Sequence, residues 1–278
     1  MSQTETQLAG GHTRPFASNN RTDKWWIEPL WTGLGFLAFA IYTTWAAFQG
    51  KYYFHGSYLS PFYSPLLFID PSAPGAPPLA HAWIGPWPNW WPSLLPASPA
   101  LLILAGPLTF RLTCYYYRKF YYRAYFATPL ACAVTAIPQK DYKGETKFLL
   151  IQNLHRYTMY IALLYIVILY ADAFESFFRD GKFGMGVGSL ILLINPTLLA
   201  FYTCGCHALR HLVGGKANSF SCCGGKPTVG YTLWEKVTKL NEHHMFWAWV
   251  SMIWVGFTDF YVRMVSMGLW HDVNTWGN

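Results

Sequence analysis

Charged residues are scarce in this sequence. Asp, Glu, Lys and Arg make up only 12% of its 278 residues, whereas a soluble domain carries about 25%. So few charges cannot cover a water-soluble globule, and the 14 Trp and 19 Tyr suit a surface that meets lipid headgroups. A basic patch with interleaved aromatic residues is also lacking outside the predicted membrane edges, so we expect no nucleic-acid partner. The composition predicts a multi-pass protein of the cell membrane, in contact with lipid.

A small-residue cleavage pattern is lacking after the first apolar run, so we expect this run to stay as a membrane anchor. A membrane-spanning helix needs about 20 mainly apolar residues, and five segments meet this requirement. The sequence therefore predicts an all-α membrane protein with five transmembrane helices in a bundle. The predicted spans are residues 30–48, 99–117, 148–170, 185–204 and 244–263 of a membrane domain at 30–270, flanked by tails at 1–29 and 271–278.

Lys and Arg residues are distributed unevenly between the two ends of these spans. Fourteen of the 20 fall in the N-terminal tail and in loops 115–147 and 205–243, and four fall on the opposite side. Because cytoplasmic loops carry the excess of Lys and Arg, we expect a cytoplasmic N-terminus and a C-terminus outside. Residues 49–98 are rich in Pro and Trp and nearly uncharged, which predicts a structured cap on the outer membrane surface. Asp259 and Arg263 are spaced to pair on one face of the last span.

Four consecutive spans each carry one Cys or His near the cytoplasmic end. They are Cys114, His155, Cys204 and His244, and at about 1.5 Å of rise per residue all four lie roughly 6–12 Å below the cytoplasmic charges. Their shared depth predicts a metal centre on one side of the membrane. Two thiolates and two imidazoles suit tetrahedral zinc or a Rieske-type [2Fe–2S] cluster. A bis-His haem b is the alternative, and would take its pair from His155, His207, His211, His243 and His244.

The stretch "YTCGCHALRHLVGG" at 202–215 holds several further candidate ligands. Read as one continuous helix, it places Cys204, His207 and His211 on a shared face. Arg210 and His211 would lie at its C-terminus, where positive charge is favourable. The adjacent cysteines of "SCCGG", Cys222 and Cys223, fall in a cytoplasmic loop and receive no role.

The segment "CGCHALRHL" resembles the haem-ligand helix of membrane-anchor, cytochrome b-like subunits of succinate dehydrogenase and fumarate reductase (respiratory complex II). The segment "NLHRYTMY" resembles the His-Arg segment that lies near the quinone in that family. "TCYYYRKFYYR" and "LNEHHMFWAWVSM" are similar to the actinobacterial, single-subunit branch, and the resemblance covers about 99–255. It implies that the chain anchors a flavoprotein and an iron–sulfur subunit on the cytoplasmic side and passes electrons from succinate to a membrane quinone.

The resemblance places Cys204 at the position of the family's haem histidine. A thiolate there favours a Rieske-type [2Fe–2S] cluster over a bis-His haem, and zinc does not change its oxidation state. We therefore predict a cluster ligated by Cys114, His155, Cys204 and His244. The alternate ligands are His243, Cys206, His207 and His211.

A quinone site needs an apolar slot and a donor for a carbonyl oxygen, and Arg156, next to His155, is the predicted donor. Asn153, Tyr157 and Thr158 are predicted to assist, and Trp25 and Trp26 to line an entrance.

Two rival functions remain. A zinc-dependent intramembrane hydrolase would need a general base, but HExxH is lacking and Glu242 is the only carboxylate near the four predicted ligands. A transporter would show inverted repeats with sites at the midplane, which five unlike spans do not suggest.

Overall fold

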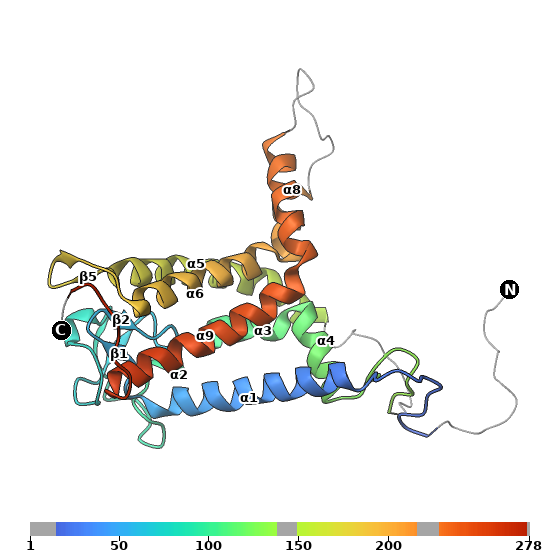
Figure 1. Ribbon diagram of the computed structural model, residues 1–278, viewed down its shortest axis with the longest axis horizontal. Coiled ribbons are helices and arrows are strands. Elements are labelled where there is room, and N and C mark those ends of the chain that lie inside the picture. Colours follow the sequence, from blue (N-terminus) through green and yellow to red (C-terminus); the bar gives the residue numbers. More distant parts are fainter. Residues whose placement is uncertain (1–14, 138–148, 216–227, 277–278) are drawn as a thin grey trace, which may run out of the picture.

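Four long helices form the body of the molecule in the computed structural model, which describes residues 15–137, 149–215 and 228–276. Figure 1 shows them running along the same axis: α1 (Ile27–Gln49), α5 (Leu149–Glu175), α6 (Val187–Cys204) and α9 (His244–Ser266). α6 packs against both α5 and α9, and α1 packs against α9. Among the described residues these four helices are long and apolar enough to cross a membrane. They correspond to the first, third, fourth and fifth predicted spans.

The predicted second span is not one helix. Residues 99–124 form three short helices, α2 (Pro99–Ile103), α3 (Ala105–Thr113) and α4 (Tyr115–Ala124). Pro107 lies in the first turn of α3, where its missing N–H is tolerated, but its ring would clash with the carbonyl of Ile103 in a continuous helix. The Tyr165 hydroxyl from α5 donates to that Ile103 oxygen at 2.8 Å, so a neighbouring helix satisfies the group that the break leaves free.

A second interruption follows at Cys114, whose extended backbone (φ −64°, ψ 135°) ends α3 and caps α4. α4 then leaves the direction of α3 and packs against α1. The second predicted span, 99–117, is therefore divided by two local breaks and does not end at residue 117.

The connector after α1 folds over one end of the bundle (Figure 1). It contains a short antiparallel pair, β1 (Phe54–His55) with β2 (Tyr58–Leu59). It also contains a parallel pair, β3 (Phe68–Ile69) with β4 (Gly85–Pro86), and the 3₁₀ helix η1 (Leu79–His81). The rings of Tyr53 and Tyr63 are fully buried and stack at 4.2 Å. The hairpin β5 (Phe178–Arg179) with β6 (Lys182–Phe183) and the C-terminal segment lie at the same end.

A buried ion pair ties α9 to this end of the molecule. Arg263 Nη2 lies 3.3 Å from Asp259 Oδ2, and both side chains are fully buried, as the i,i+4 spacing predicts. The Tyr42 hydroxyl from α1 donates to Asp259 at 2.6 Å. Arg263 donates to the carbonyl of Lys51 at 2.8 Å. The pair therefore joins α9, α1 and the connector, and each charge has further hydrogen bonds, as burial requires.

At the opposite end, two helices project from the bundle. α6 ends at Cys204, α7 (His207–Gly214) follows after a break, and α8 (Val229–Glu242) leads back to α9. α7 and α8 pack against each other, and Figure 1 shows α8 standing across the direction of the long helices. The Thr228 side chain caps α8 by accepting from the backbone N–H of Tyr231 at 3.2 Å.

Candidate functional site

Two Cys–His contacts lie at the end of the bundle where α7 and α8 begin. Cys114 Sγ is 3.8 Å from His244 Nε2, and Cys206 Sγ is 3.0 Å from His155 Nε2. Cys114, Cys206 and His244 are each at most 2% exposed, and His155 is half-buried. The four side chains thus bring two thiols and two imidazoles into the interior of the protein.

Both cysteines occupy breaks between helices. Cys114 separates α3 from α4, and Cys206 separates α6 from α7, each with an extended backbone in the N-cap position of the following helix. Cys206 Sγ accepts from the backbone N–H of Ala208 at 3.4 Å. Burial raises the pKa of the Cys206 thiol to about 12, because desolvation disfavours the thiolate.

Aromatic rings separate the two imidazoles. Phe110 stacks on His155 with ring centres 4.7 Å apart, and Tyr202 stacks on His244 at 5.0 Å. Phe110 and Tyr202 contact each other at 5.4 Å.

Arg111 is a buried cation beside this group. It is 8% exposed and its guanidinium donates to Ser251 Oγ at 3.3 Å, to the Ala248 carbonyl at 3.4 Å and to the Tyr117 hydroxyl. It also lies over the ring of Tyr202 at 5.1 Å. Among the described residues, no carboxylate forms an ion pair with it. Its positive charge therefore stabilises negative charge that develops on nearby groups, and this effect is stronger in the protein interior than in water.

The predicted ligands are only partly brought together. Cys114 and His244 are in contact, but His155 meets Cys206, which was an alternate, instead of Cys204. Cys204 is the last residue of α6 and half-buried. The shared face of Cys204, His207 and His211 is wrong, because the chain breaks between α6 and α7. His207, His211 and His243 are exposed. Cys222 and Cys223 lie outside the described residues.

In the part of the chain that the structure describes, no three His, Cys, Asp or Glu side chains are grouped so that they could hold one metal ion. The predicted [2Fe–2S] cluster at Cys114, His155, Cys204 and His244 is therefore not supported, and the described residues show two separate Cys–His contacts instead. Glu242, the base that a zinc hydrolase would need, is exposed at the end of α8.

The predicted quinone residues lie in different parts of the described structure. Asn153, Arg156 and Tyr157 lie on the exposed face of α5, and Arg156 Nη2 is 2.6 Å from His211 Nδ1. Thr158 is buried and donates to the His155 carbonyl at 3.1 Å. Trp25 and Trp26 precede α1, and Figure 1 shows α1 and α5 along opposite edges of the bundle. Trp25 and Trp26 thus lie beside a different helix from Arg156, and their role at an entrance stays a prediction.

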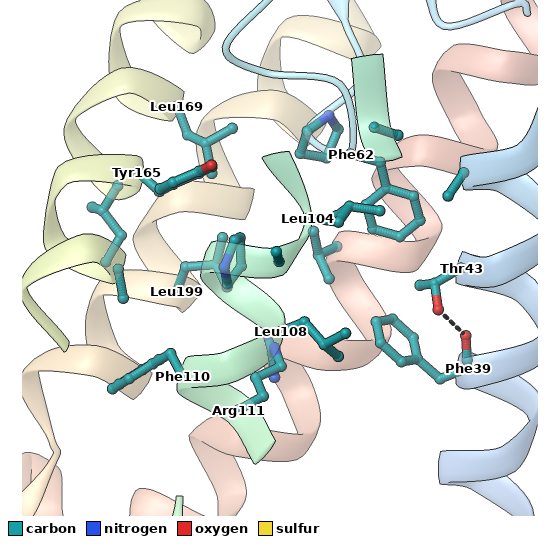
Figure 2. A pocket seen from close by; sticks show the side chains of 18 of the residues that line it. Phe39, Thr43, Phe62, Leu104, Leu108, Phe110, Arg111, Tyr165, Leu169 and Leu199 are labelled. Atoms are coloured by element: carbon teal, nitrogen blue, oxygen red, sulfur yellow. Dashed lines mark hydrogen bonds between the residues drawn. The ribbon is translucent and has the colours of Figure 1, made fainter. Parts of the chain in front are cut away.

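A cavity of about 370 Å³ lies between α1, α2, α3, α5 and α6, with Val255 of α9 also lining it. Figure 2 shows mainly apolar side chains around it, among them Phe39, Leu104 and Leu199, with Arg111 at one end. The sequence did not indicate this cavity, because its lining comes from segments that are far apart along the chain. The one local signal was Pro107, whose helix break lies on the cavity wall.

The comparisons with known proteins agree with each other. Residues 27–268 match the family model described as actinobacterial succinate dehydrogenase subunit SdhC. The chain is also similar to a chain of the solved Mycobacterium smegmatis Sdh1 complex in the apo form, with 40% identity and a TM-score of 0.82. That match covers 96% of this chain and 97% of the other. Among curated proteins, no sequence matches.

Proposed function

The chain belongs to the family of actinobacterial succinate dehydrogenase SdhC subunits, and from this premise we propose that it reduces a membrane quinone with electrons from succinate. As a membrane subunit of this oxidoreductase it resides in the plasma membrane. Succinate oxidation to fumarate releases two electrons and two protons, and a quinone takes up two of each to become a quinol. The soluble subunits supply the electrons, and the aqueous phase supplies the protons.

The orientation follows from the basic side chains. α4, which contains Arg123, and α8, which contains Lys236 and Lys239, lie at the end of the molecule opposite the connector. Because cytoplasmic loops carry the excess of Lys and Arg, we assign this end to the cytoplasm. The N-terminus would then lie inside and the C-terminus outside, with α2 to α4 together crossing the membrane as a fifth, broken span. The flavoprotein and iron–sulfur subunits would dock on this cytoplasmic end. This places the two Cys–His contacts next to the docking surface.

The donor set at these contacts fits a Rieske-type [2Fe–2S] cluster in its composition, with two sulfur and two imidazole ligands. Cys114, Cys206, His155 and His244 would hold it, so Cys206 replaces Cys204 in the proposed set. His244 Nδ1 is buried without a hydrogen-bond partner among the described residues, whereas Nε2 is the ring nitrogen that faces Cys114. When bound, such a cluster supplies one-electron transfer inside the membrane.

The chain's own residues support this transfer. The stacked rings of Phe110 and Tyr202 hold the two imidazoles in place and exclude water from them. Arg111 places a fixed positive charge 5.1 Å from the centre of the Tyr202 ring, which would stabilise an added electron in this low-dielectric region.

Family membership over residues 27–268 is the observation that carries the proposal. The test compares the purified complex with a preparation that lacks only this chain. Both should oxidise succinate with an artificial acceptor such as phenazine methosulfate, but only the complete complex should reduce a quinone. Equal quinone reduction by the soluble subunits alone would contradict the proposal.

A further inference from the structure

We propose that the protons for quinone reduction come from the outer aqueous phase, and that Asp172 of α5 passes them into the membrane interior. This role rests on the proposed function, whose protons have no assigned source. Ionisable side chains in membrane helices are rare, and they serve as proton relays in pumps and transporters. Asp172 is such a side chain, half-buried near the outer end of α5.

A small polar pocket lies between the outer end of α5 and the connector. Its volume is about 70 Å³, and the polar side chains that line it are Ser57, His81, Asp172 and Glu175. His81 and Glu175 are exposed, so the pocket reaches the outer surface. One water molecule needs roughly 10–15 Å³ of such volume and about two to four polar partners. The pocket therefore has room for several water molecules next to the Asp172 carboxyl group.

Asp172 lies between this polar pocket and the large apolar cavity. On α5, Leu169 lines the cavity, and Asp172, about one turn further along, lines the pocket. In the connector, Phe62 lines the cavity and Pro65 lines the pocket. Figure 2 shows Phe62 and Leu169 near the same end of the cavity. Between these two layers, the buried Ser64 hydroxyl donates to the Asp172 carboxylate. A proton on Asp172 is thus about one helical turn away from the cavity.

Asn195 of α6 is a second polar side chain at the depth of Asp172. The Tyr170 hydroxyl of α5 donates to Thr197 Oγ1 of α6 at 3.1 Å. Asp172 and Asn195 each lie two residues from this contact on its outer side, because α5 and α6 are antiparallel. Asn195 is 1% exposed, and its amide oxygen and nitrogen have no hydrogen-bond partner among the described residues. Buried polar groups without a protein partner bind ordered water. Leu199, on the same face of α6, lines the cavity, so such water would continue the polar route inward.

The cytoplasmic end of the cavity carries a charge that opposes proton entry. Figure 2 shows Arg111 at the end of the cavity opposite Leu169. A fixed arginine in a membrane pore excludes protons and other cations by electrostatic repulsion. None of the described side chains that line the cavity is a carboxylate or an imidazole, so proton acceptors of these types are not found along its wall. The charges at the two ends of the cavity therefore favour proton entry from the outer side.

The surroundings of Asp172 let its carboxyl group gain and lose a proton. Two titratable groups face it across the polar pocket, Glu175 on its own helix and His81 of η1. α6 carries no charged side chain, and the connector contributes the Ser64 hydroxyl. Among the described residues, no Lys or Arg forms an ion pair with Asp172. A permanent counter-charge that would keep the carboxylate ionised is thus lacking in this part of the structure.

The proton balance of this route differs on the two sides of the membrane. The Asp172 carboxylate takes a proton from water in the polar pocket, releases it inward and is ionised again for the second proton. The quinone gains two electrons from succinate and these two protons, and becomes a quinol. Oxidation of succinate releases two protons on the cytoplasmic side. Each turnover therefore removes two protons from the outer phase and adds two to the cytoplasm.

The first test measures proton uptake by the whole complex in proteoliposomes that contain a trapped pH dye. Succinate is added outside and does not cross the bilayer, so only complexes with their soluble subunits outward turn over. The outer face of these complexes meets the lumen. With valinomycin and K⁺ to remove the membrane potential, the lumen should become alkaline during reduction of a short-chain quinone, by two protons per succinate. A constant lumen pH during turnover would overturn the proposal.

Substitutions at Asp172 test the residue in the same vesicles. Asp172→Asn keeps a side chain that can bond to Ser64 but cannot carry a proton. It should slow lumen proton uptake and quinone reduction about tenfold or more, and Asp172→Glu should restore most of the rate. Raising the lumen pH should slow the parent complex but not Asp172→Asn. Asp180→Asn is the matched control, because Asp180 is an exposed acid on the same side outside the pocket, and it should behave like the parent.

The outcomes separate the role of Asp172 from the proposed function. Proton uptake by Asp172→Asn at the parent rate would overturn the role, and so would equal loss in Asp172→Asn and Asp172→Glu, which would indicate a structural effect. Succinate oxidation with an artificial acceptor shows that each variant complex is assembled. If the parent complex oxidises succinate but does not reduce quinone, the proposed function itself is wrong, and the role of Asp172 is wrong with it.

Discussion

His155 and Cys206 are 51 residues apart in the chain, yet the His155 Nε2 and Cys206 Sγ atoms lie 3.0 Å apart. The contact exists because α6 stops at Cys204 and the chain turns at Gly205, whose backbone N–H still bonds to the Phe201 carbonyl at 3.0 Å. At Cys206 the chain changes direction and runs toward α5. Two cysteines separated by one residue thus differ in whether they face the buried imidazoles.

The first prediction uses this difference. Cys206→Ala should remove the EPR signal of a reduced Rieske-type cluster and lower the iron content of the complex by two atoms, because one proposed ligand is lost. Quinone reduction should fall at least tenfold, with succinate oxidation by an artificial acceptor retained.

Cys204→Ala is the matched control, two residues away, and should leave the iron content and EPR signal unchanged. The reverse result would return Cys204 to the ligand set. A sharp haem α-band in the parent protein would show that the centre is haem b.

The sequence predicted those features that depend on local composition and spacing. Four apolar segments of sufficient length became α1, α5, α6 and α9, and the spacing of Asp259 and Arg263 predicted their pairing. The error at Cys204 came from extending a helical face through Gly205. Where a helix ends depends on which of its backbone N–H and C=O groups find hydrogen-bond partners outside the helix. The periodicity of side chains along the sequence does not reveal this.

The divided second span and the cavity show a different limit. The sequence contains Pro107 in this span, but a proline in a membrane helix can be accommodated or can break it. Here the outcome depends on Tyr165, 58 residues later, which bonds the carbonyl of Ile103. The cavity wall depends on the same break and on side chains from helices that meet only in the folded bundle.

A second prediction concerns this bond between helices. Tyr165→Phe should destabilise the complex by about 0.5–1.5 kcal/mol, because the Ile103 carbonyl loses its donor in an apolar region. The measurement is the thermal unfolding midpoint of the purified complex. Tyr160→Phe is the control, since Tyr160 is 45% exposed, and it should change the midpoint much less. Equal shifts in the two variants would show that the Tyr165 hydroxyl has no special role.

A third prediction concerns the buried ion pair. Asp259→Ala should destabilise the protein by about 3–5 kcal/mol, because the Arg263 guanidinium is left as an uncompensated buried charge. The double variant Asp259→Leu with Arg263→Met should recover a large part of this loss, since no charge stays buried. Denaturation of the detergent-solubilised complex, followed by proteolysis of the unfolded fraction, measures both effects. A double variant as unstable as Asp259→Ala would show that the hydrogen bonds to Tyr42 and Lys51 matter more than the charge balance.

The last prediction concerns Arg111, a buried cation without a carboxylate partner among the described residues. Its charge should raise the reduction potential of a centre at the Cys–His contacts, because it stabilises the reduced, more negative state. Arg111→Gln should therefore lower the midpoint potential by about 60 mV or more, which for a one-electron couple is a tenfold change in the equilibrium constant. The measurement is a redox titration of the complex followed by EPR.

Arg111→Lys separates charge from shape in the same titration. It keeps the positive charge and should retain most of the potential, although a lysine cannot reproduce the hydrogen bonds to Tyr117, Ala248 and Ser251. Arg156→Gln is the second control, because Arg156 is exposed and its field is screened by solvent. If Arg111→Gln and Arg111→Lys lowered the potential equally, the guanidinium would act through packing and hydrogen bonds. An unchanged potential in Arg111→Gln would place the redox centre away from these contacts.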